Sequence, residues 1–103
     1  MNKLERKFQA SLIKELKTRY PKALIFKNES FQGAPDILIL KGKKWAALET
    51  KRGHKSKKQP NQEYYVDLMN DMSFASFICP ENKQEVLDDL ERTFTPRRRT
   101  RIS

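Results

Sequence analysis

The 103-residue sequence is poor in the residues that form disulfides, zinc sites and hinges, with one cysteine, one histidine and three glycines. A single cysteine excludes an internal disulfide, and with a single histidine it argues against a zinc site. Cys79 ends the apolar run Phe77-Ile78-Cys79 and is interpreted as a core residue. This cysteine usage indicates a protein of a reducing compartment.

Long apolar stretches are also missing. No segment is long enough to span a membrane, and the first residues, Met1–Arg6, contain no apolar signal region. We therefore expect a soluble, cytoplasmic protein without a membrane partner. The length fits one compact domain with a modest core, which dimerisation would help to stabilise.

Neither an internal repeat nor a long linker divides the chain. We assign residues 1–95 to a single domain. Residues 96–103 contain four arginines after Pro96 and are predicted to form a basic, disordered tail.

Acidic residues are outnumbered, with 13 Asp and Glu against 22 Lys and Arg, so the formal net charge is +9. This excess makes a polyanion the leading partner, and nucleic acid is the commonest one. The alternative is a basic surface that only keeps the protein soluble.

The pattern of apolar residues predicts an α/β fold. Residues 3–20 place apolar side chains on one side of a helical wheel and lysines on the other, and Pro21 ends this helix. The remaining pattern predicts strands over 23–26, 36–40 and 45–51, a helix over 60–71, a strand over 74–79 and a helix over 81–94. The helix between the last two strands allows a parallel crossover, so we expect a central mixed sheet flanked by helices.

Two acidic residues are expected to face each other across a predicted hairpin. The segment Lys41–Lys44 joins the second and third strands, and Gly42 suits the first central position of a two-residue type II′ turn. Counting outward from this turn places Asp36 opposite Glu49. The Cβ atoms of directly opposite residues lie about 4.5–5.5 Å apart.

Opposed carboxylates destabilise a hairpin, and burial of the sheet between helices makes the conflict worse. A divalent cation such as Mg²⁺ between Asp36 and Glu49 would remove it. Lys51 lies two residues beyond Glu49 and on the same side of the strand, where an ammonium group can orient a hydroxide or stabilise charge on a phosphate. The alternative is that Asp36 only starts a strand, while Glu49 and Lys51 pair with each other.

Glu5 lies within the apolar side of the predicted first helix and is a candidate fourth residue of this site. The alternative is that its carboxylate satisfies backbone N–H groups at the start of the helix.

Basic residues follow the predicted strands and fill the tail. We expect phosphate contacts, and hence salt-dependent binding, from Lys43, Lys44, Arg52, Lys55, Lys57, Lys58, Arg97, Arg98 and Arg99. The alternative is a solvated loop and a tail that touches nothing. Tyr64, Tyr65 and Met69 are interpreted as core or dimer-interface residues rather than as residues that stack on bases.

Pro35-Asp36 followed by Glu49-Thr50-Lys51 resembles the PD-(D/E)xK signature of restriction-endonuclease-like nucleases, whose αβββαβ core matches the order of elements above. Within that superfamily the chain looks most similar to the small virus-type replication-repair nucleases (VRR-NUC) of phages and bacteria. Glu5, the segment Gly33–Asp36 and Gln62 carry this second likeness. One departure is the highly basic loop 52–59, which lacks the glycine-rich spacing expected in many relatives and leaves substrate preference open.

The resemblance implies Mg²⁺ or Mn²⁺ as cofactor, held by Asp36, Glu49 and the backbone carbonyl of Thr50. It assigns Lys51 to the nucleophile or transition state. Glu5 would contribute through a water or a second metal, and Gln62 would position Lys51, the water or a phosphate. The implied protein is a phage-type nuclease of a bacterial host.

These expectations combine into a metal-dependent DNA endonuclease, a homodimer acting on branched DNA such as a four-way (Holliday) junction. Two alternatives remain: a DNA exonuclease or single-strand nuclease, and a non-catalytic nucleic-acid-binding module.

Overall fold

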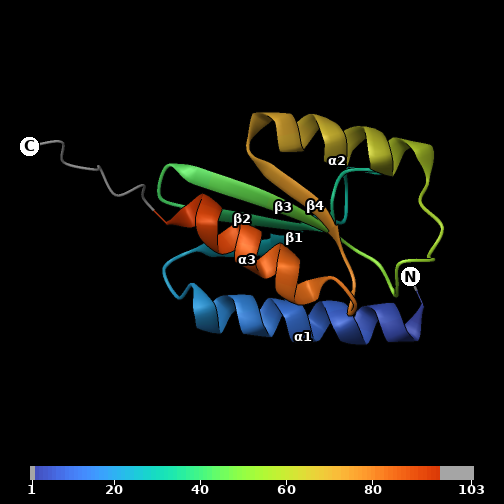
Figure 1. The fold of residues 1–103 in the computed structure, drawn as a ribbon, viewed down its shortest axis with the longest axis horizontal. Helices are drawn as coiled ribbons and strands as arrows, with labels where there is room; N and C mark the ends of the chain where they lie inside the picture. Colours follow the sequence, from blue (N-terminus) through green and yellow to red (C-terminus); the bar gives the residue numbers. More distant parts are fainter. Residues whose placement is uncertain (1, 96–103) are drawn as a thin grey trace, which may run out of the picture.

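Seven elements follow one another in the predicted order in the computed structural model, which describes residues 2–95 (Figure 1). They are α1 (Lys3–Arg19), β1 (Leu24–Lys27), β2 (Ile37–Lys41), β3 (Lys44–Thr50), α2 (Pro60–Met72), β4 (Phe74–Ile78) and α3 (Lys83–Phe94). The predicted tail, residues 96–103, lies outside the described residues.

The four strands form one mixed sheet in the order β1-β2-β3-β4. Strand β2 is antiparallel to both β1 and β3, whereas β4 runs parallel to β3 after the crossover through α2. The predicted αβββαβ-type core with a mixed sheet is therefore confirmed. None of the helices in the part of the chain that the structure describes is long and apolar enough to cross a membrane.

The hairpin between β2 and β3 has the predicted turn and register. Gly42 adopts a φ of +62°, as the first central position of a type II′ turn requires. Among the described residues only glycines have a positive φ, so Lys43 has the negative φ of the second central position. Lys41 lies opposite Lys44, and the register continues to Ile37 opposite Leu48. The next step along both strands brings Asp36 and Glu49 together.

Helices cover the two faces of the sheet unequally. Figure 1 shows α1 and α3 on one side of the sheet and α2 on the other. The larger core lies under α1 and α3, where their buried leucines pack on Ile37, Ile39 and Leu48 of the sheet. The smaller core lies under α2, where Val66 packs on Ala47 and Ala75. Because α2 packs mainly on β3 and β4, Leu24, Phe26 and Leu40 stay exposed on the same face of β1 and β2, although Leu38 of β2 packs against the smaller core.

All seven elements differ from their predicted bounds, by one residue at one or both ends and by two residues at the start of the last helix. Two of these differences have a visible cause, because a side chain takes over backbone hydrogen bonds. The last helix begins at Lys83 rather than at residue 81, since Asn82 accepts a hydrogen bond from the Cys79 N–H and donates to the Phe77 carbonyl. Strand β2 begins at Ile37 rather than at Asp36. The side chain of Asp36 instead accepts a hydrogen bond from the Thr50 N–H.

Candidate active site

Asp36 is held in place through both its backbone and its side chain. Its carbonyl accepts a hydrogen bond from the Asn28 N–H at 2.7 Å, which extends the β1–β2 ladder by one step. Its Oδ2 accepts from the Thr50 N–H at 3.2 Å and from the Thr50 hydroxyl at 2.7 Å. Asp36 is therefore a rigid carboxylate at the end of the hairpin.

Glu49 is almost completely removed from solvent, with 3% of its surface exposed. Burial is the main cause that raises its pKa to about 9, and repulsion from the Asp36 carboxylate is the second. The nearest compensating donor is the Gln62 amide, whose Nε2 lies 3.4 Å from Glu49 Oε2. The two acids thus face each other as the register predicts.

Lys51 is also buried, with 8% of its surface exposed, which is unusual for a lysine. Its Nζ donates to Gln62 Oε1 at 2.8 Å and to the Lys57 carbonyl at 3.1 Å. An ammonium group has three N–H donors, so one remains for a ligand. The lysine is held by protein groups but is not paired directly with Glu49 in a salt bridge among residues 2–95.

Gln62 links the carboxylate to the lysine. It is the third residue of α2, and its side chain also accepts from the Gln59 N–H at 3.1 Å, forming a capping box at the start of the helix. Pro60 supports this geometry because its fixed φ suits the first turn. The start of α2 therefore holds the Gln62 amide in contact with both Glu49 and Lys51. The family resemblance assigns a positioning role to this residue.

Glu5 lies half-buried in the first turn of α1, one helical turn before Gln9, whose amide contacts Thr50. Its negative charge is the weakest of the causes that raise the pKa of Glu49. The N–H of Glu5, not its carboxylate, takes part in the cap with Asn2. Its position is therefore that of an outer acid of the site.

Gln9 and the side chain of Thr50 belong to the site, although the sequence analysis did not assign them. Gln9 is 4% exposed and donates from Nε2 to the Thr50 hydroxyl at 2.9 Å, and that hydroxyl donates in turn to Asp36. A signal for Gln9 exists in the sequence: it lies one helical turn after Glu5, so both residues share a face. The buried chain Gln9–Thr50–Asp36 orients the carboxylate.

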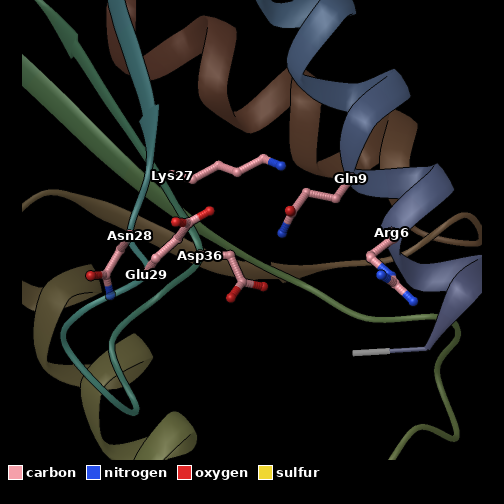
Figure 2. A pocket seen from close by; sticks show the side chains of 6 residues that line it. All are labelled: Arg6, Gln9, Lys27, Asn28, Glu29 and Asp36. Atoms are coloured by element: carbon pink, nitrogen blue, oxygen red, sulfur yellow. The ribbon is translucent and has the colours of Figure 1, made fainter.

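A polar cleft of about 190 Å³ opens beside Asp36. Figure 2 shows Asp36 between the first turns of α1 and the segment that leaves β1. The cleft is lined by Arg6, Gln9, Lys27, Asn28, Glu29 and Asp36. Only Asp36 of these six was assigned from the sequence.

The structure separates the basic residues that the sequence analysis grouped together. Lys57 contacts the site through its carbonyl, and Lys58 lies over the Phe77 ring at 4.5 Å. Arg52 and Lys55 line an open hollow with His54 and Glu81. Lys43 and Lys44 lie at the hairpin turn, at the opposite end of β3 from Glu49, roughly 17 Å away at about 3.3 Å per residue. They occupy the predicted hairpin turn, and their phosphate contacts stay a prediction, whereas Arg97, Arg98 and Arg99 lie outside the described residues.

The donor set fits a hard divalent cation. Asp36, Glu49 and the carbonyl of Thr50 supply only oxygen atoms, and this carbonyl points to the Asp36 side of β3 because the N–H of the same residue does. No group of three or more His, Cys, Asp or Glu side chains that could hold a metal occurs within residues 2–95. Mg²⁺ needs no such group, since one or two carboxylates with water and substrate phosphate satisfy it.

In three comparisons, the chain matches no protein-family model, no curated protein and no solved structure. The likeness to PD-(D/E)xK nucleases therefore rests on the motif residues and on their geometry.

Proposed function

We propose that this protein is a nuclease of the PD-(D/E)xK type that hydrolyses DNA phosphodiester bonds with Mg²⁺ or Mn²⁺. One observation carries the proposal: Asp36, just before β2, the buried Glu49 of β3 and the buried Lys51 lie at one end of the sheet, and Gln62 links the last two. The net charge of +9 suits a polyanionic substrate. The proposed place of action is the bacterial cytoplasm, which contains DNA.

Each side chain has a defined part in this proposal. Asp36, Glu49 and the Thr50 carbonyl hold the cation, which when bound supplies Lewis-acid stabilisation of charge on the phosphate. Lys51 uses its remaining N–H donor to orient the attacking water or to stabilise a phosphate oxygen in the transition state. Gln62 positions Lys51, and Glu5 acts from the outer side of the site.

A pure binding module explains these residues less well. Phosphate-binding lysines lie at the surface, whereas Lys51 is buried beside two acids. Burying Glu49 beside Asp36 costs free energy, and a protein that only binds DNA gains nothing in return. The opposed acids are consistent with a site selected for chemistry.

The test is incubation of the purified chain with labelled duplex, flap, single-strand and four-way DNA, with Mg²⁺ and with EDTA. We expect cleavage that requires the metal, with the four-way junction as the preferred substrate. Cleavage only from free ends would establish an exonuclease instead. Binding without cleavage of any substrate under either condition would overturn the proposed activity.

We propose further that the active form is a homodimer. Leu24, Phe26 and Leu40 are exposed on the part of the sheet face that α2 leaves uncovered. On α2, Tyr64, Leu68 and Met72 recur at helical spacing and are exposed as well. This strip lies toward the β1–β2 side, because the adjacent Tyr65 packs edge-on against Phe31 of the loop between those strands. Met69, interpreted as a core or dimer-interface residue, packs against the smaller core.

The apolar surface suits a second copy because an isologous contact covers the same patch on both chains. A twofold dimer also supplies the two sites that symmetric cleavage of a four-way junction requires. Light scattering should report about twice the chain mass of 12.2 kDa.

The Met72→Glu variant should reduce this mass to that of the monomer, because it places a charge within the apolar contact. Leu4→Glu is the matched control, since Leu4 is exposed to a similar degree, 62% against 65%, but belongs to the start of α1. If wild type is a monomer at micromolar concentration, or Met72→Glu remains a dimer, the surface has another role.

A further inference from the structure

Two cations face the cleft beside Asp36 without any partner among residues 2–95. Arg6 belongs to the first turns of α1 and Lys27 ends β1, so distant parts of the chain supply them. Both side chains are exposed, and neither forms a salt bridge or a side-chain hydrogen bond within the described residues. Figure 2 shows the Lys27 side chain extending toward α1, with Arg6 on the helix itself.

The two amide side chains of the cleft already have partners. Asn28 donates to the Phe31 carbonyl and accepts from the N–H groups of Ser30 and Phe31, so its amide holds the loop. Gln9 donates to Thr50. Each amide keeps one further N–H, so the charged donors left for a ligand are the guanidinium and the ammonium.

The lining chemistry selects the kind of ligand. No aromatic side chain lines the cleft, so it offers no surface on which a base could stack. An arginine fork beside a lysine is suited to a phosphate, which the fork can bind with two parallel hydrogen bonds. Glu29 and Asp36 repel such an anion, so the two cations must outweigh them or the metal must offset Asp36.

We propose that this cleft binds one backbone phosphate of the DNA strand, next to the phosphate that is cut, through Arg6 and Lys27. The inference rests on the proposed nuclease function and adds a subsite to it. The site would fix the register of the strand, so that the neighbouring phosphodiester lies at Asp36 and Glu49. It accounts for two basic residues that the motif does not include.

The first experiment measures DNA affinity in EDTA, where no cleavage occurs, as a function of salt concentration. Arg6→Gln and Lys27→Gln should each weaken binding roughly fivefold and flatten the slope of log affinity against log salt by about 0.9. Lys17→Gln removes the same charge from the far end of α1 and should leave the slope unchanged within about 0.2. Glu29→Gln should tighten binding, because it removes a repulsive charge from the cleft.

The second experiment identifies the phosphate. Replacing single phosphates of the strand by uncharged methylphosphonate should weaken wild-type binding at one position next to the cut. Arg6→Gln should lose most of that sensitivity at the same position only, because the two changes remove one shared contact. Inorganic phosphate at millimolar concentration should compete no better than chloride of equal ionic strength, which separates a strand phosphate from a free one.

Two results would overturn the subsite. In one, Arg6→Gln and Lys27→Gln behave like Lys17→Gln while wild type binds and cuts DNA, so the nuclease proposal stands without it. In the other, methylphosphonate affects wild type and Arg6→Gln equally at every position. Failure of the wild type to cut DNA in the presence of Mg²⁺ would instead overturn the function on which the inference depends.

Discussion

Asp36→Asn should abolish DNA cleavage, with a fall in rate of at least about a thousandfold, while the affinity for DNA in EDTA stays within a few-fold of wild type. The substituted amide retains an oxygen that can accept the hydrogen bonds from the Thr50 N–H and hydroxyl, so the fold is preserved. What is lost is the negative charge that holds the cation. Single-turnover cleavage with saturating enzyme measures the rate without interference from binding.

The matched control is Asp67→Asn, which makes the same chemical change at an exposed position on α2. It should cut at the wild-type rate. Circular dichroism should show the same helical content for both variants. Full activity in Asp36→Asn would show that Asp36 is not part of the site. The assignment of the metal ligands would then be wrong.

The acidic pair could be predicted from the sequence because its geometry is local. A two-residue turn sets the register of the hairpin, and Gly42 identifies the turn, so Asp36 and Glu49 follow by counting. Lys51 also lies close to the hairpin in sequence, and side-chain alternation was enough to place it. Gln62 was assigned only through the likeness to the VRR-NUC nucleases.

The cleft could not be predicted in this way, because Arg6 and Lys27 come from elements whose contact depends on how α1 packs on the sheet. Nothing in the local pattern of α1 specifies which of its basic residues faces the end of β1. Gln9 shares a helix face with Glu5, but its role depends on a partner, Thr50, that lies 41 residues further along the chain.

Lys43 and Lys44 lie at the hairpin turn, as the sequence predicts, and the extended strand β3 separates this turn from Glu49. The uncovered apolar part of the sheet was not visible in the pattern. It depends on α2 lying over β3 and β4 rather than over β1 and β2.

Glu49→Gln should raise the free energy of unfolding in EDTA at pH 8, although it removes a residue of the proposed site. In wild type, burial and the facing Asp36 carboxylate raise the pKa of Glu49 to about 9, against an ordinary 4.5. The unfolded chain therefore gives up this proton near pH 4.5, whereas the folded chain resists doing so until about pH 9. A neutral amide of the same shape avoids that conflict.

The sign of the pH dependence follows from the raised pKa. The carboxyl group contributes stability that is fully present below pH 4.5 and is lost as the pH rises toward 9. The stability advantage of Glu49→Gln over wild type should therefore grow between these two values, to the order of 1–3 kcal/mol at pH 8. Thermal unfolding would show about 4–8 °C of shift per kcal/mol for a domain of this size.

Magnesium should reverse the order of the two proteins. Wild type gains stability as Mg²⁺ binds its folded state, by about 2.7 kcal/mol at one hundred times the dissociation constant, and Glu49→Gln should gain little. Glu85→Gln serves as the control, because Glu85 is exposed in the first turn of α3. This substitution should lower stability slightly, since it removes a negative charge that interacts favourably with the helix dipole. Mg²⁺ should not change this effect. If Glu49→Gln is instead less stable than wild type in EDTA at pH 8, the carboxylate is well compensated by protein groups, and the physical need for a cation between Asp36 and Glu49 disappears.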